Sequence, residues 1–440
     1  MLIEFRVENH RSIRDEQALT LEAAGPAGGD DSRPRQVAGF KKPLLPAAAL
    51  YGANASGKSN VLSALVFMRD AVMNSHRAWP PEGGLPRDPF AWGARATEPS
   101  LYEATFVFDG VRYRYGFVAD DEQFLEEWLY AWPESRKQMW FERDGQDFKY
   151  GVYLTGENRT VAQVTRANAL FLSSAAQLRH PQLGKVYSWF SRIRSVMPSR
   201  RGYGFVRGGR SAFYDPMMQR ILEAQHRGGN QLSLFDDAVD ADPEVIEFLG
   251  LLRAADVGIE DLRVQEAEDD ASPAARFRGV SRRRVFFRHG SEDDGAWLPL
   301  DEESHGTQTL YRLGPRLLGA LKLGSLMLVD EIESGMHPAL AVEIVRQFND
   351  PRTNPRNAQI LFTSHDTHLL GNLLGEPALR RDQVWLTEKD AEGATCLYPL
   401  TDYKPRPAEN LERGYLQGRY GAIPFLGDLI APTEPPADDE

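Results

Sequence analysis

Cysteine is almost absent from this sequence, which has one, Cys396, among 440 residues. A single cysteine excludes an internal disulfide framework and any metal site built from several cysteines. No uninterrupted apolar stretch is long enough to span a bilayer, and the first residues, MLIEFR, lack the basic-then-apolar layout of a signal peptide. These absences predict a cytoplasmic protein that makes no membrane contact.

An excess of basic residues is also missing. Lysine and arginine together number 51 against 63 aspartates and glutamates, which gives a formal net charge of −12. Because an acidic chain repels phosphate backbones, general attraction to nucleic acid is excluded, and any DNA contact would need a local basic patch. The composition is otherwise globular, and the length allows two or three domains.

The hydrophobic pattern divides the chain into four segments. Buried strands and alternating runs dominate the first, helical periodicity dominates the second, strands and helices return in the third, and the fourth is acidic and rich in proline. We therefore predict an α/β fold with an antiparallel side sheet and a helical insertion. The predicted boundaries are 1–165 for the N-terminal part, 166–262 for the insertion, 263–430 for the C-terminal part and 431–440 for a disordered tail.

The antiparallel side sheet is predicted from short alternating runs between about residues 79 and 153. In the stretch YEATFVFDGVRYRYGFVAD, the pair Asp109-Gly110 separates two such runs. Asp-Gly between alternating strands is typical of a tight hairpin turn, because both positions require a positive φ.

The octapeptide GANASGKS, Gly52 to Ser59, fits the pattern G-x-x-x-x-G-K-S and lies between an apolar strand and an amphipathic helix. Backbone N–H groups of such a loop bind phosphates at the helix N-terminus, the lysine reaches the β- and γ-phosphates, and the serine hydroxyl coordinates Mg²⁺. The motif predicts ATP and Mg²⁺ as cofactors. The expected contacts come from Gly52, Asn54, Ala55, Ser56, Gly57, Lys58, Ser59 and Asn60.

Two adjacent carboxylates, Asp330 and Glu331, follow the apolar run LMLV. A P-loop enzyme needs an acid at a strand end for its metal, so Asp330 is predicted to act with Ser59 as a Mg²⁺ ligand. Glu331 is predicted to act as the general base that activates the attacking water. The alternative interpretation makes Glu331 an ordinary polar residue at a strand end.

A further apolar strand, ILFTS, ends at His365. Because parallel strands present their carboxyl ends to one crevice, this imidazole is predicted to lie near the γ-phosphate and to be catalytic, together with Glu331 and Lys58. A structural histidine is the alternative. His368 forms an H-x-x-H pair with His365, but without a third ligand we predict no metal site there.

The segment ESHGTQ, Glu303 to Gln308, precedes a predicted helix over Thr307 to Leu321. The positive N-terminus of that helix suits a phosphate group. Taken alone, the same residues also fit a simple N-cap turn.

In this order the motifs resemble those of ABC-type ATPase heads of the RecF, SMC and overcoming-lysogenization-defect group. GANASGKSN is similar to Walker A, SHGTQ to a divergent signature, LMLVDE to Walker B, ESGMHP to the D-loop region and TSHD to the switch histidine. VENHRSI resembles the opening hairpin of that group, which implies that Asn9, Arg11 and Ser12 approach the nucleotide. The resemblance covers most of the chain and is poorest in the helical insertion.

In that group two heads enclose two ATP molecules, and each site combines Walker A and B of one subunit with the signature of the other. The resemblance implies a homodimer or higher oligomer in which Ser304, Gly306 and Gln308 contact the γ-phosphate across the interface. His305 departs from the standard signature, where glycine is commoner. Two residues are candidates for the Q-loop glutamine, Gln163 and Gln177.

The C-terminal stretch from VWLTEKD to GAIPFL is similar to stand-alone AAA-family ATP-binding proteins of prokaryotic anti-phage and abortive-infection operons, the PARIS type among them. In that group the ATPase senses infection and controls a separate effector, often TOPRIM-like. The resemblance implies an effector protein encoded nearby. The trigger, the stoichiometry and the choice between activation and restraint of the effector stay open.

Other functions share these motifs. A DNA-repair ATPase that clamps duplex DNA would use the basic segments 199–210 and 282–284, which also fit solvated loops. A nucleotide-stabilised scaffold would not need Glu331. An intrinsic TOPRIM nuclease is disfavoured, because little chain follows His365 and the acidic pair Asp240-x-Asp242 lies in a charged loop without strands.

Overall fold

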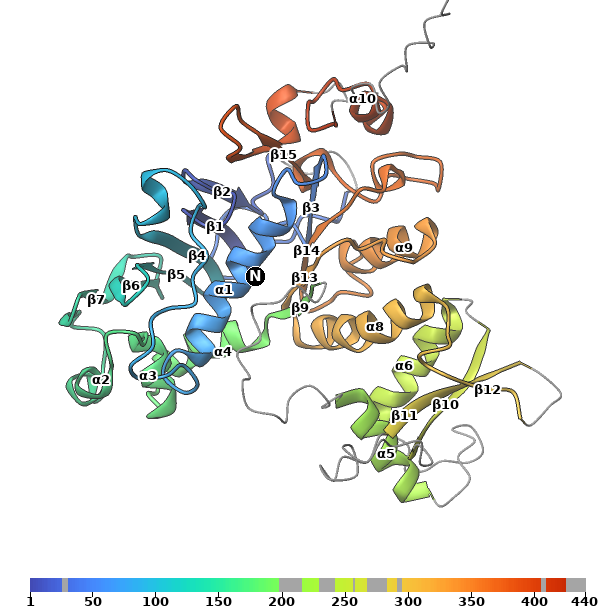
Figure 1. The fold of residues 1–440 in the computed structure, drawn as a ribbon, viewed down its shortest axis with the longest axis horizontal. Helices are drawn as coiled ribbons and strands as arrows, with labels where there is room; N and C mark the ends of the chain where they lie inside the picture. The colour runs from blue at the N-terminus through green and yellow to red at the C-terminus, as the bar shows by residue number, and fades with distance from the viewer. Residues whose placement is uncertain are drawn as a thin grey trace, which may run out of the picture.

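The computed structural model describes residues 1–25, 31–197, 216–228, 242–255, 258–266, 283–290, 295–404 and 409–424. Within them the chain forms three β-sheets with helices around them (Figure 1). The predicted mixed α/β class is confirmed. No described helix combines the length and apolarity that a membrane crossing requires. The predicted tail, 431–440, lies outside the described residues.

The central sheet has six strands, of which five are parallel and the edge strand β16 is antiparallel. Every residue of β3, β13 and β14 is buried, because layers of the protein cover both faces of the sheet. The strand order is β16 (Thr395–Pro399), β15 (Val384–Lys389), β3 (Ala47–Gly52), β14 (Gln359–Thr363), β13 (Leu326–Val329) and β9 (Arg194–Val196).

Alternate residues of β3 face two different cores. Ala48 and Leu50 pack with α1 (Lys58–Asn74) and the antiparallel sheet. Ala49 and Tyr51 pack with α8 (His305–Leu323) and α9 (Pro338–Asn349). Because strand side chains alternate in direction, the apolar run of β3 requires cover on both sides, and Figure 1 shows α1 on one side and α8 and α9 on the other.

The second sheet is antiparallel and has seven strands. Asp109 and Gly110 turn β4 into β5 with φ values of 48° and 73°, as the Asp-Gly pair predicts. The strand order is β2 (Gln17–Thr20), β1 (Leu2–Glu8), β4 (Ser100–Phe108), β5 (Val111–Ala119), β6 (Phe124–Trp132), β7 (Gln138–Asp144) and β8 (Asp147–Tyr150).

Helices α2 (Asn158–Val164), α3 (Phe171–Gln177) and α4 (Leu183–Arg192) accompany the seven-stranded sheet. Trp189 of α4 stacks on Phe106 of β4 with 3.9 Å between ring centroids. The described residues also form short helices: η1 (Ala94–Ala96), η3 (Thr367–Leu369), η4 (Arg381–Gln383), η5 (Leu400–Tyr403) and α10 (Leu411–Leu416).

The third sheet is antiparallel and has the order β10 (Ile259–Glu266), β11 (Arg283–His289), β12 (Trp297–Pro299). It shares a core with α5 (Pro216–Gly228) and α6 (Pro243–Ala254) and with one end of α8. The packing therefore differs from the expected helical insertion over 166–262, because α3 and α4 cover the seven-stranded sheet and β9 joins the central one. Apolar residues at helical spacing indicate that a helix has an apolar face, but they do not show which other element packs against that face.

Candidate functional site

The ends of three parallel strands bring the motif segments together. Leu50 of β3 lies opposite Thr363 of β14, and Val329 of β13 lies opposite Phe362. Carboxyl ends of neighbouring parallel strands open into one crevice. The loop after β3, the acidic pair after β13 and the histidine after β14 therefore share this edge of the sheet.

Three hydrogen bonds join the serine of the P-loop to the acidic pair. Ser59 Oγ and Thr363 Oγ1 each donate to Asp330 Oδ1 over 2.7 Å. The Glu331 N–H in turn donates to Thr363 Oγ1, also over 2.7 Å. Thr363 lies within the TSHD segment, and its only signal in the sequence is a hydroxyl at the end of a buried strand.

Lys58 begins α1 and lies under the phosphate-binding loop. Its Nζ donates to the carbonyl oxygens of Gly52 (2.8 Å) and Ala53 (3.0 Å). Burial lowers the pKa of Lys58 to about 8, and the nearby carboxylates of Asp330 and Glu331 oppose that shift. The ammonium group therefore remains mainly charged at neutral pH and is available to a polyanion.

Glu331 has a left-handed backbone with φ of 54°, and its side chain is exposed at the strand end. Such a conformation costs a non-glycine residue on the order of 1 kcal/mol and is frequent at functional sites. The hydrogen bond from its N–H to Thr363 holds this conformation. The carboxylate thus projects from a fixed backbone position beside Asp330.

Glu333, which sequence reasoning did not single out, ties the segment after β13 to the histidine loop. Its Oε1 accepts a hydrogen bond from the His365 N–H over 2.6 Å, and its Oε2 is buried without a partner among the described residues. The segment that resembles a D-loop is therefore bonded directly to the residue that resembles the switch histidine.

The two histidines of the H-x-x-H pair have different surroundings. Burial lowers the pKa of His365, with the positive charge of Lys58 as the next cause, so its imidazole is neutral at pH 7. His368 lies 2.5 Å from Asp366 (Nδ1 to Oδ1), and this bond raises its pKa. His368 thus belongs to the turn that follows the strand.

The signature-like segment begins α8. Ser304 is the N-cap, and its Oγ accepts a hydrogen bond from the Thr307 N–H, so the predicted N-cap turn is present. Gln308 Nε2 donates to the Glu303 carbonyl over 2.9 Å. A Cβ on Gly306 would lie 2.6 Å from the carbonyl oxygen of Gly335, so this segment packs tightly on the D-loop-like one.

The turn after β1 contacts the P-loop through Ser12, whose Oγ accepts a hydrogen bond from Asn60 Nδ2 over 2.6 Å. Arg11 is bonded to Asp88, to which its backbone N–H and its Nε both donate. Asn9 is fully buried, and its Nδ2 donates to the carbonyl oxygens of the 95–99 segment, including that of Glu98. Asn9 therefore has a structural role.

Neither Q-loop candidate lies near the phosphate-binding loop. Gln177 ends α3, which is bonded to the C-terminal end of α1 through Ser75 and His76. Gln163 lies in α2, which packs beside α3. Because α1 has 17 residues, about 25 Å of helix separates this region from Lys58.

The hydroxyl of Ser59 and the carboxylate of Asp330 suit Mg²⁺, which prefers oxygen ligands and takes few from protein when phosphates and water supply the rest. Among the described residues, no group of three or more histidine, cysteine, aspartate or glutamate side chains could hold a metal ion. The pair therefore fits a cation held jointly by protein and nucleotide.

Comparison with known proteins agrees with this geometry. A family model described as "AAA domain, putative AbiEii toxin, Type IV TA system" matches residues 47–371, which is well over half of the chain. The chain belongs to this family and carries an AAA-type P-loop ATPase domain. No curated protein matches the chain.

Proposed function

We propose that the protein is an ABC-type ATPase head that hydrolyses ATP, dimerises around shared ATP sites and thereby controls a separate effector in anti-phage defence. The hydrogen bond between Ser59 and Asp330 is the observation that carries the proposal, because it joins Walker A to Walker B at one strand edge. The description of the matched family, which names an AbiEii toxin and a type IV toxin–antitoxin system, is compatible with a defence role.

In this proposal each residue has a defined task. Backbone N–H groups from Gly52 to Ser59, together with Lys58, would bind the phosphates. Ser59 and Asp330 would hold Mg²⁺, which would supply charge neutralisation at the phosphates. Glu331 accepts the proton of the attacking water. His365, neutral at pH 7, donates a hydrogen bond toward the γ-phosphate oxygens.

Dimerisation follows from the signature in the same proposal. Ser304, Gly306 and Gln308 at the N-terminus of α8 would contact the γ-phosphate held by a second copy. The tight packing of Gly306 on Gly335 supports this role. A movement of the signature on dimerisation would displace the D-loop-like segment, and Glu333 of that segment is hydrogen-bonded to His365. The effector would be a protein encoded nearby, such as a TOPRIM-like nuclease.

The described residues favour neither alternative function. For a DNA clamp, the basic segment 199–210 and Arg282 lie outside the described residues. Asp240, of the acidic pair weighed for a TOPRIM nuclease, also lies outside them. Arg283 and Arg284 lie exposed on β11. A scaffold that does not hydrolyse nucleotide gives no reason for Glu331 to occupy a strained backbone position beside Asp330.

The test is the Glu331→Gln variant, co-expressed with the genomic neighbours and analysed by light scattering and ATP turnover. We expect turnover to fall at least roughly 100-fold, because the general base is lost. We also expect the mass to double with ATP and Mg²⁺, and a second protein to remain bound. Lys58→Ala should abolish both turnover and the change in mass. The proposal is overturned if both variants hydrolyse ATP like the wild type.

A further inference from the structure

We propose that the hairpin formed by β15 and β16 positions the phosphate-binding loop, and that Thr395 is its main positioning residue. This inference rests on the proposed ATP-binding function and adds a structural element that no motif indicates. The hairpin lies beside β3 in the central sheet, since β15 pairs with β3 over Ala49 to Gly52. Its second strand begins at Thr395, next to the loop.

A chain of hydrogen bonds runs from α1 through the hairpin to the loop. Asn60 Nδ2 donates to Ser12 Oγ (2.6 Å), Ser12 Oγ lies 2.7 Å from Thr395 Oγ1, and Thr395 Oγ1 donates to the Ser56 carbonyl (2.8 Å). The Ser56 carbonyl can only accept, so the single hydroxyl hydrogen of Thr395 is used in that bond. The hydrogen between Ser12 and Thr395 must therefore come from Ser12. Each hydroxyl thus donates once and accepts once in a single direction.

A second chain holds the same loop residue. Ser56 Oγ lies 2.6 Å from Thr387 Oγ1, which donates to the Tyr51 carbonyl over 3.2 Å. Thr387 and Thr395 are buried, with exposed fractions of 0% and 1%. Water is therefore excluded as a replacement partner, and loss of either hydroxyl leaves a buried polar group of the loop unpaired.

The Thr395 bond orients a phosphate-binding donor. The Ser56 carbonyl and the Gly57 N–H belong to one planar trans peptide unit, in which they point in opposite directions. Because the Ser56 carbonyl points to the hairpin, the Gly57 N–H points away from the hairpin. That N–H makes no hydrogen bond within the described residues, so it is available to an anion.

Contact between hairpin and loop also accounts for the glycine at position 57. A Cβ there would lie 2.0 Å from Thr395 Oγ1, and the φ of Gly57 is 110°. Glycine is thus required at position 57 for two reasons. The Thr395 side chain occupies the volume that a Cβ would need, and the backbone has a positive φ that favours glycine. The Thr395 side chain therefore packs directly against the Gly57 backbone.

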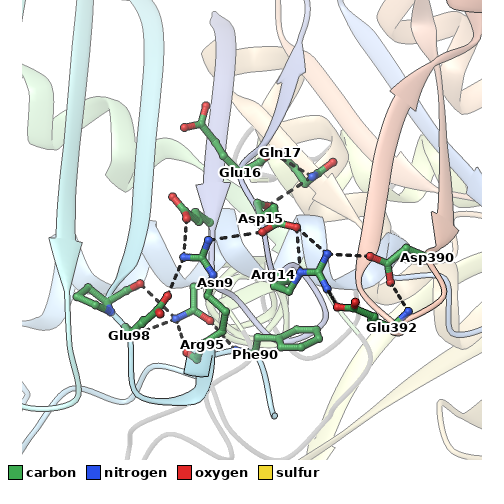
Figure 2. A network of polar contacts seen from close by, with 12 residues as sticks. Asn9, Arg14, Asp15, Glu16, Gln17, Phe90, Arg95, Glu98, Asp390 and Glu392 are labelled. Carbon is green, nitrogen blue, oxygen red and sulfur yellow. Dashed lines mark hydrogen bonds and ion pairs between the residues drawn. The ribbon is translucent and has the colours of Figure 1, made fainter. Parts of the chain in front are cut away.

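Ion pairs fasten the outer end of the hairpin to the N-terminal turn (Figure 2). Arg14 lies 3.0 Å from Asp390 and is also paired with Glu392. On the same side, Trp92 Nε1 donates to the Glu392 carbonyl over 3.2 Å. The N-terminal turn therefore holds the hairpin at its tip through Arg14 and, next to the tip, at the first residue of β16 through the bond between Ser12 and Thr395.

The test compares Thr395→Val, which keeps the shape and removes the hydroxyl, with Thr395→Ser, which keeps the hydroxyl. Thr105→Val is the matched control, because the buried Thr105 hydroxyl of β4 has no partner within the described chain. Binding of a non-hydrolysable ATP analogue is measured by calorimetry, ATPase KM and kcat by steady-state kinetics, and folding by thermal melting without nucleotide.

For Thr395→Val we expect the Kd of the analogue and the KM for ATP to rise roughly tenfold, with kcat at saturating ATP nearly unchanged. Thr395→Ser and Thr105→Val should bind like the wild type. If Thr395→Val does not fold, Thr387→Val tests the second chain with the same expected rise.

The inference is overturned if the valine variant binds like the wild type, or if the serine variant is weakened as much as the valine variant. Lys58→Ala separates the two proposals. If the wild type itself fails to bind the analogue, the proposed ATP-binding function fails. If the wild type binds, Lys58→Ala does not and Thr395→Val binds normally, only the hairpin inference fails.

Discussion

At the scale of single residues, Thr363 connects the two acids of the site. Its hydroxyl donates to Asp330 and accepts from the Glu331 N–H, so one side chain orients a carboxylate and fixes a left-handed backbone. Both bonds are 2.7 Å long and lie at the end of a buried strand. Preorganisation of this kind sets catalytic groups before substrate arrives.

We therefore expect Thr363→Val to lower kcat roughly 10- to 100-fold, because a hydrogen bond to a charged group contributes about 1.5–3 kcal/mol. ATP turnover with Mg²⁺ measures this effect. Thr363→Ser restores the hydroxyl and should recover most of the rate. Equal turnover by the valine variant and the wild type would show that Thr363 does not orient the site.

At the scale of elements, His10 joins the turn after β1 to a strand and a helix. Its ring is fully buried, with Nδ1 2.9 Å from the Tyr102 hydroxyl of β4 and Nε2 2.9 Å from the Ser63 hydroxyl of α1. Burial lowers the pKa of His10 to about 3, with Arg11 as a lesser cause. The neutral ring therefore holds three elements together at physiological pH.

The pKa of His10 in the folded state lies below its unfolded value of 6.5. Between these two pKa values His10 is protonated in the unfolded chain and neutral in the folded chain. The stability linked to His10 is complete above pH 6.5 and is lost as pH falls toward 3. The expected loss between pH 7 and pH 5 is about 2 kcal/mol.

Urea unfolding at the two pH values measures this loss. We expect His10→Gln to be less stable at pH 7 but to lose about 2 kcal/mol less than the wild type on acidification. An identical pH dependence for the two proteins would contradict the buried neutral state of His10.

At the scale of the whole molecule, the shared-site proposal makes a prediction about mixtures of variants. Glu331→Gln removes the proposed general base and is expected to keep ATP-dependent dimerisation, and Ser304→Arg disables the exposed signature serine at the start of α8. In a mixed dimer one site combines both defects, and the other combines an intact Glu331 with an intact signature. Two inactive proteins should therefore restore activity to each other.

We expect an equal mixture to recover roughly a quarter of the wild-type ATPase rate, because half of the dimers are mixed and each keeps one intact site of two. A mixture of Glu331→Gln with the Glu331→Gln, Ser304→Arg double variant has no intact site and serves as the control. Absence of recovery in the first mixture, although each variant is folded, would rule out sites shared between copies.

Local pattern alone determined the elements around the phosphate-binding loop. The apolar run before Gly52 and the helical spacing after it predicted β3 and α1, and the runs before Asp330 and His365 predicted β13 and β14. These predictions were possible because burial on two faces and helical amphipathicity leave periodic marks in adjacent residues. The Asp109-Gly110 turn was predictable for the same reason, since its chemistry lies in two neighbouring residues.

Only the tertiary structure decided what packs against those elements. Thr387 and Thr395 meet Ser56 across 331 and 339 positions of sequence, and nothing around either threonine marks it. Likewise, α4 has a periodic apolar face, but its cover by the seven-stranded sheet could not be read from that period. Hydrogen bonds and core contacts between distant segments depend on how the sheets are ordered in space, whereas sequence periodicity records only which side of an element is buried.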